Sequence, residues 1–328
     1  MTRDVPEDFD QVAVVGAGLM GHGIALTFAL DGRSVSLYDV DEATLAESES
    51  RVRSVLDTFV AAGKVDVGTA DDAAARIDRT TSLPAAVEDA TFVTEAVVED
   101  PDIKREVFEA LSTHADPEAV LASNTSGLSI TELASATDRP ERVVGTHWFN
   151  PPYVVPLVEV VRGAETSDAV VDATYALLER LGKTPVRVEK DVPGFIGNRL
   201  QMAMAYEAFS LLDRGVASPE AIDRAIKAGF GFRLPLLGMF EKADHSGLDV
   251  HHDVVEYLLP ELDRGTTPNR SLAERIEEEA YGLKSGEGVY DWSDADPEAV
   301  YEQRDEALLA LHDLYERFDM AKTPWTDG

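Results

Sequence analysis

The feature that most constrains the fold is a glycine-rich turn between a short apolar run and a helical pattern. Residues 11–15 (QVAVV) are typical of a buried strand, and residues 16–21 (GAGLMG) lead from it into a helix. Gly16 permits a tight turn, Gly18 lets the backbone approach a diphosphate, and Gly21 lets the helix pack on the strand. The N-terminus of that helix offers amide donors to the phosphates. The pattern predicts a dinucleotide-binding α/β domain.

An acidic residue at the end of the next strand-like run indicates which dinucleotide is bound. This run is residues 34–39 (SVSLYD), and Asp39 lies 18 residues after Gly21. Its carboxylate would accept hydrogen bonds from the ribose hydroxyls and would repel a 2′-phosphate, which favours NAD over NADP. The alternative is a solvated acid, since Asp41 and Glu42 follow at once. The position of Asp39 at the strand end favours the ribose contact.

Strand-like and helix-like segments alternate as far as residue 188. Strands are expected near residues 90–97, 119–124, 143–146, 154–160 and 185–188, and helices near 43–61, 102–114 and 168–181. This alternation predicts a doubly wound parallel sheet, a Rossmann domain over residues 1–188. From residue 189 to 328 the pattern is helical, with helices expected near 195–214, 221–228, 250–262, 271–280 and 298–317. The predicted fold class is α/β, followed by an all-α C-terminal domain.

The charge balance argues against several kinds of partner. The chain has 62 acidic and 29 basic residues, a formal net charge of −33. Such a surface repels nucleic-acid phosphates and anionic lipid, so neither is an expected partner. The acid excess is spread along the whole chain, which predicts adaptation to a salt-rich cytoplasm, where molar salt screens charges within about 3 Å. The alternative is an ordinary acidic protein.

Two absences in the sequence narrow the location and the chemistry. The chain has no cysteine, which excludes disulfides and thiolate catalysis. Its first eight residues lack the basic and apolar regions of a signal peptide. The uncharged stretch at 143–158 is 16 residues long and is broken by prolines, so it is not expected to span a bilayer. We therefore expect a cytoplasmic protein with no membrane partner.

One of the seven histidines has surroundings suited to acid–base chemistry. His147 lies at the end of an expected strand, and Glu159 follows twelve residues later. A carboxylate beside a histidine fixes its tautomer and stabilises the imidazolium, which makes a general base near neutral pH. Residues 123–126 (SNTS) place further polar groups at the edge where α/β sheets bind ligands. The alternative is a packed histidine, which is how we interpret the other six, and the lack of an HxxxH or HExxH pair predicts no metal site.

Several segments together resemble the L-3-hydroxyacyl-CoA dehydrogenase family. They are residues 15–21 (VGAGLMG), 123–126 (SNTS), 147–151 (HWFNP) with Glu159, and 193–199 (PGFIGNR). The segments occur in the order of the family, and the resemblance covers nearly the whole chain. It implies NAD as cofactor, an acyl-CoA thioester as substrate in fatty-acid or butanoate metabolism, and a homodimer formed through the helical domain.

The resemblance also implies roles for single residues. His147 would be the base and Glu159 its orienting partner, while Ser126 and Asn198 would contact the substrate. The implied cofactor contacts are Gly16, Gly18, Leu19, Met20, Gly21, Asp39, Glu99, Lys104, Ser126, Asn150 and Lys284. Ser54 and Lys64 are candidates for contact with CoA. Arg51 and Arg53 could meet the CoA phosphates or could form ion pairs within their helix, and the alternative for Lys104 and Lys284 is a solvated surface lysine.

Other functions stay open at this point. Residues 238–241 (GMFE) replace the commoner GPFE, and this region resembles branches of the family that act on free hydroxy acids such as L-gulonate and L-carnitine. A free hydroxy acid is therefore the alternative substrate. A non-enzymatic NAD-binding protein is a further alternative, against which the intact set of Ser126, His147, Glu159 and Asn198 argues.

Overall fold

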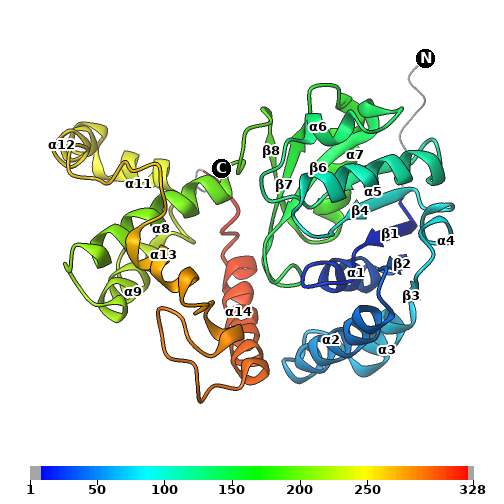
Figure 1. Cartoon of the computed structure of the whole chain (residues 1–328), viewed down its shortest axis with the longest axis horizontal. Coiled ribbons are helices and arrows are strands. Elements are labelled where there is room, and N and C mark those ends of the chain that lie inside the picture. The colour runs from blue at the N-terminus through cyan, green and yellow to red at the C-terminus, as the bar shows by residue number, and fades with distance from the viewer. Residues whose placement is uncertain (1–8, 324–328) are drawn as a thin grey trace. The chain divides into compact units, whose positions relative to one another are not determined.

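The structure is a computed structural model that describes residues 9–323 (Figure 1). The chain divides into two compact units, the first ending at Arg199 and the second beginning at Leu200. The boundary between the units therefore lies within the long helix α8 (Gly197–Asp213), beyond the boundary expected at residue 188.

The first unit is an eight-stranded sheet with flanking helices. The strands are β1 (Gln11–Val15), β2 (Ser34–Tyr38), β3 (Ile77–Thr80), β4 (Phe92–Glu95), β5 (Val120–Ser123), β6 (Val143–Trp148), β7 (Leu157–Arg162) and β8 (Thr184–Val188). The helices are α1 (Gly21–Leu30), α2 (Glu42–Ala61), α3 (Val67–Ala75), α4 (Leu83–Val87), α5 (Pro101–His114), α6 (Ile130–Ala134), the 3₁₀ turn η1 (Pro140–Arg142) and α7 (Asp168–Arg180). The strand order is β3-β2-β1-β4-β5-β6-β7-β8, so consecutive crossovers leave β1 in opposite directions. The predicted Rossmann fold class is confirmed.

The sheet departs from the predicted all-parallel arrangement at one pair of strands. β6 and β7 are antiparallel, because the connection between them is too short to carry a crossover helix. Within this connection the amides of Val154 and Val155 donate to the carbonyl of Pro151, which forms a turn where the sequence predicted the start of a strand. β7 therefore begins at Leu157. The antiparallel register places His147 directly opposite Glu159.

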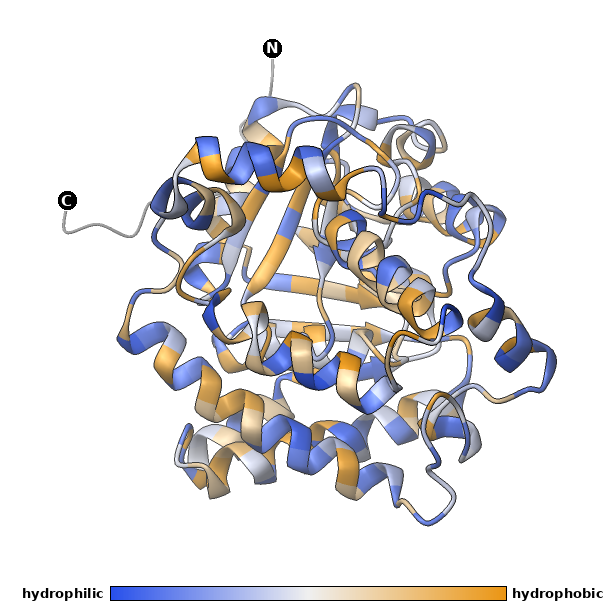
Figure 2. Ribbon diagram, turned by 90° about the vertical axis from the view of Figure 1, so that its left-hand side faces the viewer, coloured by the Kyte–Doolittle hydropathy of each residue, from blue (hydrophilic) through white to orange (hydrophobic). Residues whose placement is uncertain are grey.

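The core of the first unit lies between the sheet and its helices. The central strands β4, β5 and β6 are buried along their whole length, as strands covered on both faces by helices require. In Figure 2 the strands are mostly orange or pale, whereas the surrounding helices alternate between orange and blue. The edge strand β3 was not predicted, since three of the four residues of its sequence, IDRT, are polar; such polarity suits an edge.

The second unit is helical, as predicted. After α8 its helices are α9 (Pro219–Ala228), α10 (Phe230–Arg233), α11 (Met239–Ser246), α12 (Leu248–Leu258), α13 (Arg270–Glu277), the 3₁₀ turn η2 (Leu283–Ser285) and α14 (Pro297–Arg317). Ser218 caps α9 and Asp296 caps α14, and each of these helices begins with a proline, the start signal that the sequence carries. Within residues 9–323 no helix is long and apolar enough to cross a membrane.

Candidate active site

The glycine-rich turn has the shape that a diphosphate needs. Gly16 has a φ of +106°, and a Cβ on it would lie 2.7 Å from the carbonyl oxygen of Ala96. A Cβ on Gly21 would lie 1.7 Å from the carbonyl oxygen of Gly16. Beside Gly18, in contrast, nothing lies within 4 Å of where a Cβ would be. Two glycines therefore close the turn and one keeps its outer face open, which fits a dinucleotide.

The start of α1 supports the same fit. Among α1 to α7, all within the described residues, only α1 begins without a side chain that caps it; the others are capped by aspartate or serine. The first turn of α1 also has no acidic residue. Its amides and its helix dipole are therefore available to a phosphate.

Asp39 follows β2 and faces the turn. One oxygen of its carboxylate accepts from the amide of Ala17 at 2.9 Å, and the other accepts from the amide of Asp41 at 3.1 Å. These two bonds orient the carboxylate beside the glycine turn while the side chain stays half-buried. Each carboxylate oxygen can accept more than one hydrogen bond, so ribose hydroxyls can still bind. The residues present fit NAD.

A buried histidine–carboxylate pair lies at the end of β6. Nδ1 of His147 is 2.7 Å from Oε2 of Glu159, and the two side chains are 4% and 1% exposed. With the carboxylate as acceptor, Nδ1 carries the proton and Nε2 keeps the lone pair. The ring of His147 packs against Phe149, at 4.5 Å between centroids, and against Phe195, at 5.7 Å. Packing and hydrogen bonding together fix the imidazole.

The other oxygen of Glu159 fixes the segment before α8. It accepts from the amides of Ile196 and Gly197, both at 2.9 Å. Burial alone would raise the pKa of Glu159, but the hydrogen bonds from the His147 ring and from the two amides outweigh this, and the pKa lies below its ordinary value. Glu159 is therefore an anion at neutral pH and can stabilise an imidazolium.

Ser126 lies on a segment held from two sides. Its amide donates to Oε1 of Glu99 at 2.8 Å, and its carbonyl accepts from Nδ2 of Asn198 at 3.0 Å. The hydroxyl of Thr125 also donates to Glu99, at 2.6 Å. The structure therefore brings together Ser126, Asn198 and Glu99, which the sequence places far apart.

Comparison with known proteins agrees with this geometry. Residues 11–192 match the family described as "3-hydroxyacyl-CoA dehydrogenase, NAD binding domain", and residues 194–292 match "3-hydroxyacyl-CoA dehydrogenase, C-terminal domain". The first match alone spans more than half of the chain. The chain belongs to the 3-hydroxyacyl-CoA dehydrogenase family. The prediction of an NAD-dependent oxidoreductase is thereby confirmed.

Similar proteins in this family carry two kinds of name. A 5-formyl-3-hydroxy-2-methylpyridine 4-carboxylate 5-dehydrogenase from Mesorhizobium japonicum is 33% identical over 305 residues, which cover 93% of this chain and 98% of that protein. A probable 3-hydroxybutyryl-CoA dehydrogenase from Bacillus subtilis is 38% identical over 288 residues, which cover 88% and 99%. Among solved structures, the pyridine-carboxylate dehydrogenase matches with a TM-score of 0.86 at 32% identity, covering 94% of this chain and 99% of its own. An (S)-3-hydroxybutyryl-CoA dehydrogenase from Ralstonia eutropha matches with a TM-score of 0.72 at 36% identity, covering 87% and 99%.

Lys104, which the family resemblance assigns to the cofactor, is buried in this structure. Its side chain is 1% exposed, and its ammonium lies 2.5 Å from Glu95 and 3.4 Å from Glu99. Glu99 itself is 42% exposed. Glu99 and Lys104 were both expected to contact the cofactor, and of these two only Glu99 has an exposed side chain that a ligand can contact. Glu95 was missed by the sequence analysis, although an acid that ends an apolar strand is a usable signal.

A lysine anchors the connection that follows His147 in this family member. The ammonium of Lys183 donates to the carbonyls of Pro152, at 2.5 Å, and Val155, at 3.1 Å, and lies over the ring of Trp148 at 5.5 Å. Burial lowers the pKa of Lys183 to about 7. Asn150, an expected cofactor contact, is exposed at the start of this connection.

The two residues expected to contact CoA lie on and after α2. Ser54 is exposed on the helix, and Lys64 is half-buried just beyond its end. The neighbouring arginines form ion pairs: Arg51 lies 2.6 Å from Glu47, and Arg53 lies 3.3 Å from Asp71. The ion pair of Arg51 lies within α2, as the second alternative expected, whereas that of Arg53 reaches Asp71 on α3.

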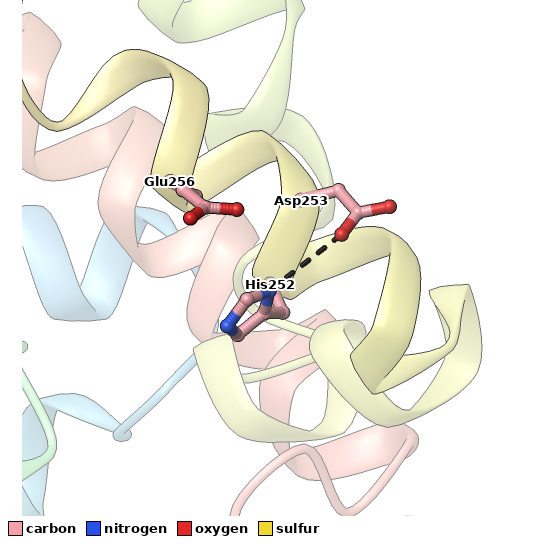
Figure 3. Close-up of side chains that lie close together, drawn as sticks. All are labelled: His252, Asp253 and Glu256. Atoms are coloured by element: carbon pink, nitrogen blue, oxygen red, sulfur yellow. Dashed lines mark ion pairs between the residues drawn. The ribbon is translucent and has the colours of Figure 1, made fainter.

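Two further expectations concern the second unit. Lys284 is exposed in η2, and its ammonium lies over the ring of Tyr281 at 5.1 Å, so its contact with the cofactor stays a prediction. On α12 the ligand atoms of His252, Asp253 and Glu256 lie within 4.8 Å of one another (Figure 3). All three side chains are exposed, and metal sites are usually supported by a second layer of hydrogen bonds, which an exposed helix face does not provide. The cluster therefore does not change our expectation of a metal-free enzyme.

Proposed function

We propose that this protein is an NAD-dependent L-3-hydroxyacyl-CoA dehydrogenase, which interconverts 3-hydroxyacyl-CoA and 3-oxoacyl-CoA in fatty-acid or butanoate metabolism. The observation that carries the proposal is the buried pair of His147 and Glu159, at 2.7 Å, beside the oriented Ser126 segment. Oxidation of a secondary alcohol needs one group that removes the hydroxyl proton, and this pair is built for that step. The names of several relatives support the acyl-CoA substrate.

Each of these residues has a definite task in the reaction. The glycine turn and Asp39 would hold NAD, which would supply the acceptor for the hydride of the substrate carbon. Nε2 of His147 takes the hydroxyl proton, and Glu159 stabilises the resulting imidazolium through Nδ1. Ser126 and Asn198, joined by a hydrogen bond, hold the oxygens of the substrate near the imidazole. In the reverse direction, His147 returns the proton to the carbonyl oxygen.

The second candidate is a dehydrogenase of a small free carboxylate. The ion pairs of Arg51 and Arg53 favour it, because these cations are already matched by Glu47 and Asp71 and offer less attraction to CoA phosphates. The relative from Mesorhizobium japonicum, whose name gives a free pyridine carboxylate as substrate, also aligns over more of this chain than the Bacillus subtilis relative does.

The expected homodimer is part of the proposal. The second unit exposes large apolar side chains, among them Phe232, Phe240 and Tyr257, which are 80%, 89% and 77% exposed. Large apolar side chains exposed in such number favour a partner that covers them. We assign these side chains to contact with a second copy of the chain, in agreement with the dimer that the family resemblance implies. The first unit then carries the cofactor and the second carries the assembly.

The test is oxidation of NADH at 340 nm with acetoacetyl-CoA, in molar KCl, with NADPH and free acetoacetate as controls. Rapid oxidation with NADH and the thioester alone is the expected result. Turnover of L-gulonate, L-carnitine or a pyridine carboxylate, with none of the thioester, would support the second candidate instead. NADH binding without turnover of any of these compounds would leave the non-enzymatic alternative.

A further inference from the structure

Glu95 is a buried carboxylate at the end of β4 whose two oxygens are both occupied. Oε1 accepts from the ammonium of Lys104 at 2.5 Å and from the amide of Val97 at 2.8 Å. Oε2 accepts from the hydroxyl of Ser123 at 2.6 Å. The side chain is 0% exposed, as is that of Ser123. Neither the glycine turn nor the His147 pair contacts this carboxylate in the hydrogen bonds of the described residues.

Two routes lead from Glu95 to the segment that carries Ser126. Through Oε2 and Ser123, whose hydroxyl oxygen accepts from the amide of Thr125 at 3.2 Å, the carboxylate fixes the backbone one residue before Ser126. Through Oε1 and Lys104 it reaches Glu99, which binds the amide of Ser126 and the hydroxyl of Thr125. Both routes end at residues 125 and 126. Such convergence defines the position of this short segment.

The electrostatics of the network make Glu95 its central member. Lys104 is a buried cation between two carboxylates, and the nearer of them is Glu95. A buried cation that loses its nearer carboxylate moves toward the remaining one or toward water. In either case Glu99, and with it the amide of Ser126, shifts from its present place. Glu95 and Glu99 are thus coupled through the ammonium of Lys104.

We propose that Glu95 is a positioning residue for the reaction, which acts on Ser126 through Ser123 on one side and through Lys104 and Glu99 on the other. The proposal rests on the proposed function, because Ser126 is placed there at the reacting groups. Glu95 itself touches neither cofactor nor substrate. It sets the place of Ser126, while Glu159 sets the place of His147, so two buried carboxylates orient the two sides of the site separately.

The variant Glu95→Gln tests this proposal. It keeps the size of the side chain and removes its charge, so that Lys104 loses its nearer anion. We expect kcat to fall by about 10- to 100-fold, because a shift of about 1 Å in a positioning group can cost that much. The dissociation constant of NADH, from its fluorescence, should rise by much less than kcat falls, since the glycine turn and Asp39 are untouched and only the Glu99 and Ser126 end of the expected cofactor contacts shifts. The pH profile of kcat/KM should keep its shape, since His147 and Glu159 are also untouched.

Matched variants separate positioning from loss of stability. Glu118→Gln removes another carboxylate that pairs with a buried cation, Arg142, in the same unit, and should leave kcat unchanged. The double variant Glu95→Gln/Lys104→Met leaves no buried unpaired charge, so it stays testable if Glu95→Gln or Lys104→Met alone does not fold. The losses in kcat of the two substitutions should not add, because both break the same route. Additive losses would overturn the assignment of Lys104 to this route.

A second measurement does not depend on turnover and separates this proposal from the proposed function. In the NADH complex, amide hydrogen exchange of residues 124–128 should be at least about tenfold faster in Glu95→Gln than in the wild type. Exchange of the amides of Ile196 and Gly197, which donate to Glu159, should not change. Unchanged exchange at 124–128, or a loss of NADH affinity as large as the loss of kcat, would overturn the role of Glu95. Failure of the proposed function would instead show as a wild type that turns over none of the substrates.

Discussion

The two units of this chain differ in how completely they bury their own apolar side chains. In the first unit Phe28, Phe92 and Phe108 are among the largest fully buried side chains, each less than 2% exposed. In the second unit Phe232 and Phe240 are 80% and 89% exposed. The first unit also caps α2 to α7 with a side chain and pairs the buried charges of Glu159 and Lys104.

This difference indicates how the work is divided. A unit that buries its apolar residues and pairs its charges can hold reactive groups at fixed distances without help from outside. A unit with large apolar side chains at its surface gains stability when a partner covers them, by roughly 25 cal/mol for each Å² of apolar surface removed from water. We therefore assign catalysis to the first unit and assembly to the second.

The largest expected effect comes from the general base of the first unit. His147→Gln should lower kcat by about 10²- to 10⁴-fold, because glutamine keeps a polar group in place but cannot accept the proton. Sedimentation velocity should show the same oligomer as the wild type. Retention of most of the activity would show that another group is the base, and a changed oligomer would break the division between the units.

Next in size is a charge among the exposed apolar side chains of the second unit. Phe240→Glu should raise the dissociation constant of the homodimer by about 100-fold. The substitution replaces an aromatic side chain that the second copy would cover with a carboxylate that must lose its water. Light scattering after size-exclusion chromatography measures this. Val67→Glu is the control, because Val67 is a 63% exposed apolar residue of the first unit. A wild type that is already monomeric, or equal effects of the two variants, would contradict the assignment of these side chains to the dimer contact.

A smaller effect is expected from pH on the buried carboxylate Glu159. Because its pKa is lower in the folded state than its ordinary value of 4.5, its stabilisation is complete above that value and is lost as the pH falls through the folded-state pKa. The free energy of unfolding of Glu159→Gln should therefore be lower than that of the wild type at pH 7, by about 1–3 kcal/mol. This difference between variant and wild type should narrow as the pH falls below 4.5. Thermal unfolding between pH 7 and 3.5 measures it, with the exposed Glu165→Gln as control; a gap independent of pH would argue against this linkage.

The smallest effect should be common to both units. With a net charge of −33 spread along the chain, removal of salt increases the repulsion between carboxylates in the folded state. We expect a change from 2 M to about 0.05 M KCl to lower the unfolding temperature by several degrees, because the screening length grows from about 3 Å or less to more than 10 Å. Calorimetry shows whether the transitions of both units shift. A melting temperature independent of salt would contradict adaptation to a salt-rich cytoplasm and favour the alternative of an ordinary acidic protein.

The sequence predicts the parts of the site that depend on neighbouring residues along the chain. The turn from Gly16 to Gly21 and its partner Asp39 need only a strand, a turn and a helix in succession, which the sequence pattern states directly. The pairing of His147 with Glu159 is also predictable, because a short connection between two strands brings residues twelve apart into register. In both cases a local pattern determines the geometry.

What the sequence does not predict depends on the choice among several partners. Lys104 has both Glu95 and Glu99 within reach, and only the folded chain shows that the buried Glu95 is the nearer. Arg53 finds its carboxylate, Asp71, on a helix that was not predicted. The sequence also does not predict which apolar side chains of the second unit are exposed. An apolar stripe on a helix has the same sequence pattern whether its own unit or a second copy covers it.

The uncapped start of α1 has a consequence for the protein without its cofactor. An aspartate in place of Met20 would supply the missing cap and stabilise the ligand-free fold by about 1 kcal/mol, but it would set a negative charge beside the diphosphate. The demands of folding alone and of ligand binding therefore conflict at this position. Free ligand at 100 times its dissociation constant adds about 2.7 kcal/mol to the stability of the fold. The stability of the fold should thus rise with the concentration of the dinucleotide, which provides the stabilisation that the missing cap does not.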